Sequence, residues 1–122
     1  NPKGNLSVIE RDTIPFAIRR VYYLYDVPSG AERGGHAHKH QEAFIIAVAG
    51  SFEVILNNGD EEHIFRLFKP NEGLYIPVNL WRELKNFSAG AVCLVISSAE
   101  FDESDYIRDF ADFRKYLQQN NR

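Results

Sequence analysis

Cysteine, methionine and long hydrophobic runs are scarce or missing, and each shortage narrows what the protein can be. Cys93 is the single cysteine, so no internal disulfide can form, and its place in the apolar stretch 91–96 predicts a buried thiol and not a nucleophile. The longest apolar run, 43–49, has seven residues, whereas a membrane span needs roughly 20. No signal-type segment opens the sequence, which favours a reducing cytoplasm, and the missing methionine leads us to expect a trimmed form of a longer product.

The charges favour neither a nucleic acid nor a membrane as partner. The sequence has 17 acidic residues against 14 Lys and Arg, a net charge of -3, and the two signs are mixed along the chain. A nucleic-acid binder is expected to show a basic face. The 122 residues are 44% apolar and include 9 Phe and 6 Tyr, enough to form one hydrophobic core without disulfide bonds or bound metal ions. We predict a single domain over residues 1–122.

Most of the chain has the pattern of an all-β protein. Short runs rich in Val, Ile, Phe and Tyr are separated by turn residues, with the clearest period-two alternation at Phe52, Val54 and Leu56. Asn57-Asn58-Gly59-Asp60 predicts a hairpin because Asn-Gly accepts the positive φ of a type I′ turn. The predicted strands are 6–9, 16–25, 36–38, 42–48, 52–57, 63–68, 74–76, 81–86 and 91–97.

The periodicity changes after Phe101. Helix-capping residues at 102–105 precede Ile107, Phe110, Phe113 and Leu117, which recur at helical spacing. We predict a helix over 105–118 that closes one end of a small β-barrel or sandwich.

Three of the four histidines lie close together, at His36, His38 and His40. Residues two apart on a strand point to the same side, so His36 and His38 would share one cavity, and Glu42 would follow if the strand continued. Such a cluster suits either a metal site or a pair of acid/base groups. His40 is predicted to face solvent or to pack.

The spacing G-x5-H-x-H-x3-E-x7-G resembles the first signature of the cupin superfamily. It is formed by Gly30, His36, His38, Glu42 and Gly50, and a second half-signature follows at Gly73, Pro77, Trp81, Arg82 and Asn86. The resemblance implies a double-stranded β-helix, or jelly-roll barrel. Where metal-binding cupins have a final histidine ligand this chain has Arg82, whose guanidinium has no lone pair for a cation. We therefore predict no metal, with a site on His36, His38 and Glu42 as the alternative.

A narrower resemblance covers residues 3–117. The motifs at 14–16, 20–23, 33–39, 73–75 and 104–108 are together similar to those of the dTDP-sugar 3,4-ketoisomerase family. The resemblance implies a cofactor-independent isomerase, a strand-exchanged homodimer, that moves a ketone from C4 to C3 of a dTDP-linked 6-deoxyhexose. It also implies a place in the synthesis of deoxyamino sugars for lipopolysaccharide or other surface glycans.

The match to the family motif also implies catalytic roles. His36 would be the base at carbon and His38 the proton shuttle between the two oxygens, or the reverse. Arg82 would keep the histidine pair neutral by charge repulsion and stabilise the enediolate oxygen. Arg33 would hold the sugar or the diphosphate through its forked donors.

Other residues are candidates for substrate contact. One of Tyr22 and Tyr23 faces the cavity, Trp81 stacks on the thymine or belongs to the core, and Glu42 orients a histidine. The alternatives to an isomerase are a non-catalytic nucleotide-sugar-binding cupin domain and a metal-dependent cupin enzyme. A 3,5-epimerase would use a similar barrel, and the C4 configuration of the product is left open.

Overall fold

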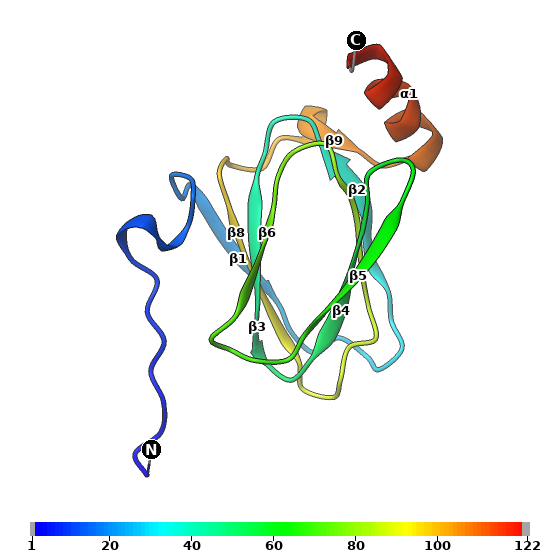
Figure 1. The fold of residues 1–122 in the computed structure, drawn as a ribbon. Helices are drawn as coiled ribbons and strands as arrows, with labels where there is room; N and C mark the ends of the chain where they lie inside the picture. The colour runs from blue at the N-terminus through cyan, green and yellow to red at the C-terminus, as the bar shows by residue number, and fades with distance from the viewer. Residues whose placement is uncertain (1, 121–122) are drawn as a thin grey trace.

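The computed structural model describes residues 2–120, with residue 34 described by its backbone only. Two antiparallel sheets form the two walls of a barrel (Figure 1). The four-stranded sheet has, in order, β1 (Arg20–Leu24), β8 (Val92–Ser97), β3 (Ala43–Ala49) and β6 (Gly73–Ile76). The five-stranded sheet has β5 (Glu62–Leu67), β4 (Phe52–Asn57), β7 (Trp81–Lys85), β2 (Arg33–His38) and β9 (Tyr106–Ile107). The all-β barrel predicted from the sequence is confirmed.

The main core fills the space between the sheets. Phe52, Val54 and Leu56 of β4 point inward, as their alternation predicts, and meet Ile45 and Cys93 from the opposite wall. The predicted hairpin is also confirmed, because β4 pairs with β5 over its whole length. Its turn is held by the Asn57 side chain, which accepts a hydrogen bond from the Gly59 N–H at 2.7 Å.

The outer face of the four-stranded sheet is only partly covered. A 3-10 helix at Arg11–Thr13 leads into Ile14, which packs with Ile46 and Ile96 on this face. Val21 and Tyr23 of β1 remain exposed on it. One barrel wall therefore keeps an apolar outer surface beside the N-terminal segment.

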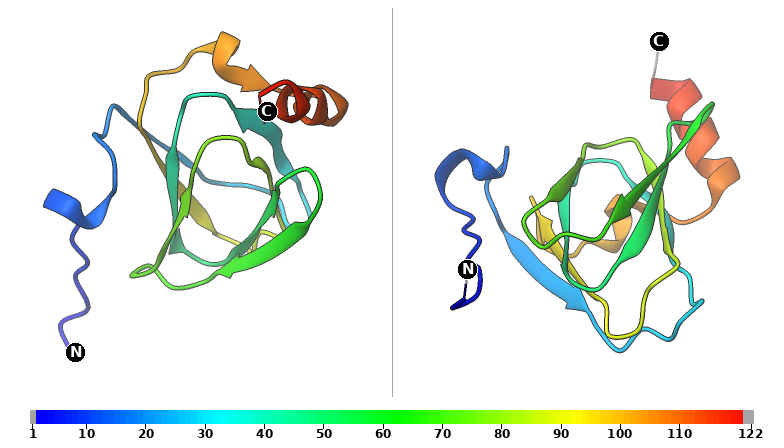
Figure 2. Two further views of the ribbon diagram at one scale, coloured as in Figure 1. Left: turned by 45° about the horizontal axis from the view of Figure 1, so that its top comes forward. Right: turned by 60° about the horizontal axis from the view of Figure 1, so that its bottom comes forward.

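The strand predicted at 6–9 is absent, so that prediction is wrong. Residues 2–9 form an extended arm that leaves the barrel (Figures 1 and 2), and Leu6 is 88% exposed. Within residues 2–120 no sheet edge pairs with this arm. Strand propensity alone does not make a strand, because the backbone also needs a hydrogen-bonding neighbour.

The C-terminal helix begins later than predicted. Helix α1 spans Phe110–Asn120, whereas 103–107 form a 3-10 helix at Glu103–Asp105 followed by strand β9. Tyr106 and Ile107 are drawn into the sheet by pairing with His38 and Ala37. The helix lies at one end of the barrel beside β2 and β9 (Figure 2).

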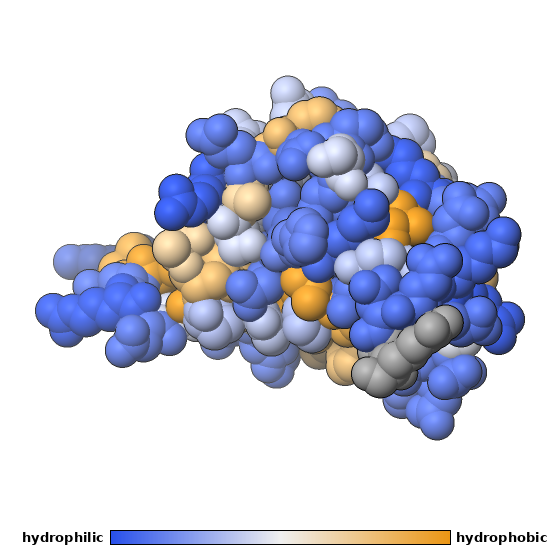
Figure 3. Space-filling model, turned by 90° about the horizontal axis from the view of Figure 1, so that it is seen from above, coloured by the Kyte–Doolittle hydropathy of each residue, from blue (hydrophilic) through white to orange (hydrophobic). Residues whose placement is uncertain are grey.

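A second cluster joins α1 to the five-stranded sheet. Phe113 is buried with Ala37, Trp81 and Ile107. From this end of the barrel the surface is mostly hydrophilic, with separate apolar patches (Figure 3). Among residues 2–120 there is no helix with the length and apolar character that a membrane crossing requires.

Candidate active site

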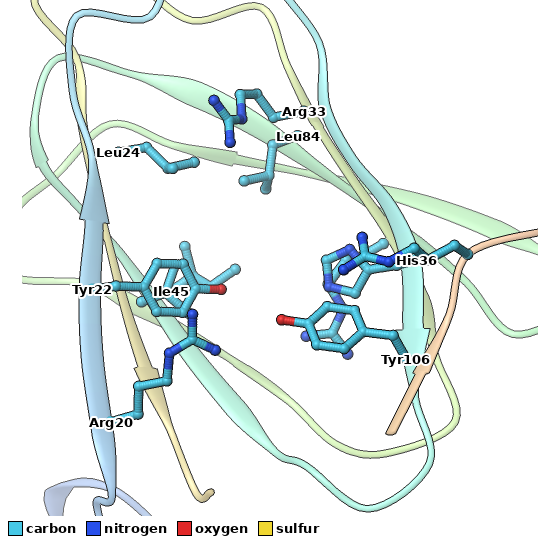
Figure 4. Close-up of a pocket in the computed structure, with 11 residues that line it drawn as sticks. Arg20, Tyr22, Leu24, Arg33, His36, Ile45, Leu84 and Tyr106 are labelled. Atoms are coloured by element: carbon cyan, nitrogen blue, oxygen red, sulfur yellow. The ribbon is translucent and has the colours of Figure 1, made fainter. Parts of the chain in front are cut away.

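A cavity of about 350 Å³ lies between the two sheets (Figure 4). The described residues that line it include four arginines and no carboxylate. They are Arg20, Tyr22, Leu24, Arg33, His36, Ile45, Arg82, Leu84, Val95, Tyr106 and Arg108. A cavity with this charge favours an anionic ligand.

Strand β1 supplies one wall of the cavity through its alternation. Arg20, Tyr22 and Leu24 point inward at intervals of two residues, whereas Tyr23 faces outward and is 59% exposed. Of the two neighbouring tyrosines, Tyr22 is therefore the one that faces the cavity. The Arg20 guanidinium lies over its ring, 4.3 Å from the centroid.

The opposite wall carries the histidines that the sequence placed together. A bulge in β2 between Gly34 and His36 includes Gly35, whose positive φ of 69° suits glycine. His36 then lines the cavity. His38 lies deeper, 2% exposed, with its ring 4.9 Å from that of His36 in an edge-to-face arrangement.

His38 is held neutral by its surroundings. Burial, and next the charge of Arg82, lower the pKa of His38 to about 4, against an opposing effect of Asp105. Its Nδ1 lies 2.9 Å from Oδ2 of Asp105. At neutral pH the ring is therefore an uncharged imidazole that is able to accept a proton.

Arg82 is a buried cation with free donors. It is 4% exposed, and burial lowers its pKa to about 10, so the guanidinium stays protonated at neutral pH. Its Nε and Nη2 are buried without a hydrogen-bond partner among the described residues. Because unpartnered buried donors are costly, they favour a ligand that brings acceptor oxygens.

Tyr106 and Arg108 also line this cavity, although their positions in the sequence predicted no role for them. The Tyr106 ring lies 5.0 Å from the His36 ring and 4.4 Å from the His38 ring, and its hydroxyl points across the cavity toward that of Tyr22 (Figure 4). Arg108 lies 4.2 Å over Tyr106 and is held by two hydrogen bonds to Glu103. The sequence feature that pointed to them was the family motif at 104–108. A helix was predicted over the same residues, and it gave no reason to place these side chains in the cavity.

Besides Tyr23, two predicted substrate contacts, Trp81 and Glu42, lie outside the cavity lining, and so does the deeper His38. Trp81 is 7% exposed, and its ring packs against Phe110 and Phe113, so it is a core residue. Glu42 accepts a hydrogen bond from the Tyr75 hydroxyl. Within residues 2–120 no three His, Cys, Asp or Glu side chains are arranged to hold a metal ion.

Known proteins share both this sequence and this fold. Residues 1–118 match the family described as FdtA: WxcM-like, C-terminal. The TDP-4-oxo-6-deoxy-alpha-D-glucose-3,4-oxoisomerase of Aneurinibacillus thermoaerophilus is 40% identical over 120 residues, covering 98% of this chain and 86% of that protein.

Solved structures agree with the sequence match. A 3,4-ketoisomerase from Helicobacter canadensis has a TM-score of 0.93 at 42% identity, covering 97% of this chain and 90% of its own. The sugar 3,4-ketoisomerase QdtA from Thermoanaerobacterium thermosaccharolyticum, in complex with TDP, has a TM-score of 0.93 at 39% identity, covering 98% and 88%. A variant of QdtA with a histidine replaced by asparagine was solved with TDP-4-keto-6-deoxyglucose. This chain therefore belongs to the FdtA family, as its resemblance to the sugar 3,4-ketoisomerases predicted.

Proposed function

We propose that this protein is an isomerase that converts a TDP-4-keto-6-deoxyhexose to its 3-keto isomer. The observation that carries the proposal is the position of His36 in a cavity lined by four arginines. The arginines suit the diphosphate of a nucleotide sugar, and a neutral imidazole suits proton removal beside a ketone. Relatives of 40% and 42% identity named as 3,4-isomerases support the same assignment.

The proposed reaction relocates two protons and needs no other reactant. His36 takes the proton from C3, and the electrons of that bond form a C3–C4 double bond while the C4 oxygen becomes an enolate. The proton on the C3 oxygen then passes to the C4 oxygen through His38. As the C3 carbonyl forms, the double bond takes a proton at C4 from the His36 imidazolium. The substrate and the product have the same atoms.

Electrostatics favours these steps. The charge of Arg82 helps to hold His38 in its basic form. The same guanidinium has two unpartnered donors, which would stabilise the negative oxygen of the enediolate. Arg82 therefore serves both the proton shuttle, His38, and the intermediate.

The remaining arginines are assigned to the diphosphate. Arg33 reaches the cavity from β2, and Arg20 and Arg108 reach it from β1 and from the segment after β9. A guanidinium fork pairs well with phosphate oxygens. Tyr22 would contact the sugar from the opposite wall. These four residues, with Arg82 and the two histidines, form the proposed substrate site.

We also propose that the domain works as a homodimer. The arm at 2–9 exposes Leu6 and Val8, and β1 exposes Val21 and Tyr23 on the nearby outer face. Apolar surface of this kind favours association, and the arm of one copy would cover the outer face of the other. Light scattering is expected to give twice the mass of one chain. A monomeric mass would exclude this assembly.

We further propose a cytoplasmic enzyme that supplies deoxyamino sugars for surface glycans. A reducing compartment suits the free thiol of Cys93. This assignment rests on the proposed substrate, because a 3-keto sugar is the form on which a transferase would place an amine.

Proton NMR in deuterated water tests the activity directly. Chelator-treated protein is mixed with TDP-4-keto-6-deoxyglucose, and the sugar C3 and C4 signals are followed. We expect a 3-keto product that carries solvent deuterium at C4, and the H4–H5 coupling of the product formed in ordinary water reveals its configuration. A protein that binds TDP but causes no exchange would be a binding module, and activity that needs added metal would indicate a metal-dependent cupin.

A further inference from the structure

Asp105 is a buried residue on which four groups from one turn converge, three at its carboxylate and one at its backbone carbonyl. Its Oδ2 lies 2.9 Å from Nδ1 of His38 and accepts the Gln41 N–H at 3.2 Å, while Oδ1 accepts the His40 N–H at 2.7 Å. The Asp105 carbonyl accepts the Lys39 N–H at 3.0 Å. Each carboxylate oxygen thus accepts a hydrogen bond from a backbone N–H group, and a backbone N–H group always remains a donor.

This arrangement decides which nitrogen of His38 carries its proton. A carboxylate has acceptor sites only, so the short contact to Nδ1 is a hydrogen bond only if Nδ1 is the donor. In a neutral imidazole that choice leaves the lone pair on Nε2.

We propose that Asp105 is a positioning residue that fixes His38 in its Nδ1–H tautomer, with Nε2 as the one basic nitrogen available for proton transfer. The proposal rests on the proposed function, in which His38 carries the proton between the two sugar oxygens. Because Tyr106 follows Asp105 in the chain and packs on both histidine rings, the same anchor also sets this cavity wall. The C-terminal segment therefore acts on the reaction through His38.

The effect of Asp105 concerns the tautomer and not the charge. The charged and titratable groups that face His38 come from several elements: Arg82 of β7, Arg20 of β1, Tyr106 of β9, His36 of its own strand and Asp105 itself. Burial and Arg82 lower the pKa of His38 more than Asp105 raises it. The ring is therefore neutral at pH 7 with or without the carboxylate, and only the position of its proton depends on Asp105.

The substitution Asp105→Asn tests the proposal because it keeps the size of the side chain. Asparagine offers one carbonyl and one NH2 group, and with its carbonyl on the His40 N–H the NH2 group faces Nδ1 of His38. That contact favours the opposite tautomer. The matched control is Asp102→Asn in the same segment, where the carboxylate is exposed and accepts hydrogen bonds from the N–H and the hydroxyl of Ser104.

The first readout is independent of activity. Long-range proton–nitrogen NMR at neutral pH is expected to show a protonated Nδ1 and an unprotonated Nε2 for His38 in the unmodified protein and in Asp102→Asn, and the reverse in Asp105→Asn. A wild-type His38 protonated on Nε2 would overturn the proposal. The spectrum of the wild-type protein therefore tests the predicted tautomer even if Asp105→Asn fails to fold.

The second readout is turnover. We expect kcat to fall on the order of 100-fold in Asp105→Asn, with the Kd for TDP unchanged within about twofold, and no such loss in Asp102→Asn. Equal loss in both variants would indicate a general disturbance of the segment and would contradict the proposal. If the unmodified protein shows the expected tautomer but no isomerisation, the proposed function fails while the placement of the proton stands. If it isomerises the sugar and Asp105→Asn does so equally well, the role of Asp105 fails while the function stands.

Discussion

His36 and Arg82 are direct cross-strand partners, where β2 resumes its pairing with β7 after the bulge. A histidine that lines the cavity is thereby placed opposite a buried guanidinium with unpartnered donors. In this position the guanidinium would act, under the proposed mechanism, on the reacting oxygens as well as on His38, whose pKa it lowers. The pairing places the proposed base and the proposed anion-stabilising group on adjacent strands of one sheet, so neither depends on a flexible loop.

Replacement of His36 is expected to remove turnover while leaving binding intact. His36→Asn deletes the base proposed at carbon but keeps a polar side chain of similar volume, so the NMR rate should fall by at least about 100-fold. The Kd for TDP, measured by calorimetry, should stay within about twofold, because the arginines are untouched. His40→Asn is the control, since its side chain is exposed. Normal turnover in His36→Asn would remove His36 from the mechanism.

Replacement of Arg82 is expected to separate activity from stability. Arg82→Met should lower kcat on the order of 100–1,000-fold, because it removes the charge and the donors offered to the enediolate. Its free energy of unfolding should not fall, because the methionine relieves a buried cation whose donors lack partners. Arg82→Lys keeps the charge but loses the fork, so its kcat should lie between those of wild type and Arg82→Met. A stability loss that parallels the activity loss would instead assign Arg82 a structural role.

The buried His38 is expected to make stability depend on pH. Its pKa is about 4 in the folded protein against 6.5 for the unperturbed group. Between these values the unfolded chain binds a proton that the folded chain does not, so the free energy of unfolding falls as the pH drops from 6.5 toward 4 and does not depend on this group at higher pH. Urea unfolding should show a loss of about 1.5 kcal/mol between about pH 6.5 and pH 5.

His38→Asn supplies the comparison for that measurement, because it removes the titrating ring. Its free energy of unfolding should be nearly flat over the same interval, whatever its absolute value. An equal slope in the two proteins would assign the pH dependence to other groups.

Cys93 is expected to be inert in the folded protein. Burial raises the pKa of this thiol to about 12, and the side chain is fully enclosed in the main core. Because the thiolate is the reactive form, labelling by a disulfide reagent at neutral pH should be at least about 100-fold slower than in urea-unfolded protein. Rapid labelling of the native protein, with loss of turnover, would show that the thiol is accessible and matters to the site.

Local patterns predicted much of this structure because several of its signals are local. Asn57 and Gly59 determine their own turn, and the alternation of β4 matches the face that it buries. The period of two correctly placed His36 and His38 on one side of a strand. It did not predict that His36 lines the cavity while His38 is buried behind it. The same period could not choose between Tyr22 and Tyr23, because alternation gives two faces without saying which is inside.

The features that could not be predicted from the sequence depend on contacts between residues far apart in the chain. The capping pattern around Asp105 is typical of a helix start, but its carboxylate instead binds the turn after β2, and Tyr106 pairs with His38. These contacts join residues more than 60 positions apart, which local periodicity does not register. For the same reason the sequence could not decide whether Trp81 contacts a ligand or belongs to the core. Its contacts with Phe110 and Phe113 of α1 place it in the core.

Strand β9 follows the other eight described strands in the chain but completes one wall of the cavity. Strands β1 to β8 are complete by Ser97, yet the wall that carries Tyr106 and Arg108, and the carboxylate that holds His38, come afterwards. The proposed site is thus divided between the barrel strands and the segment that follows them. Loss of this segment would leave both histidines in the chain but would remove one wall of the cavity and the carboxylate beside His38.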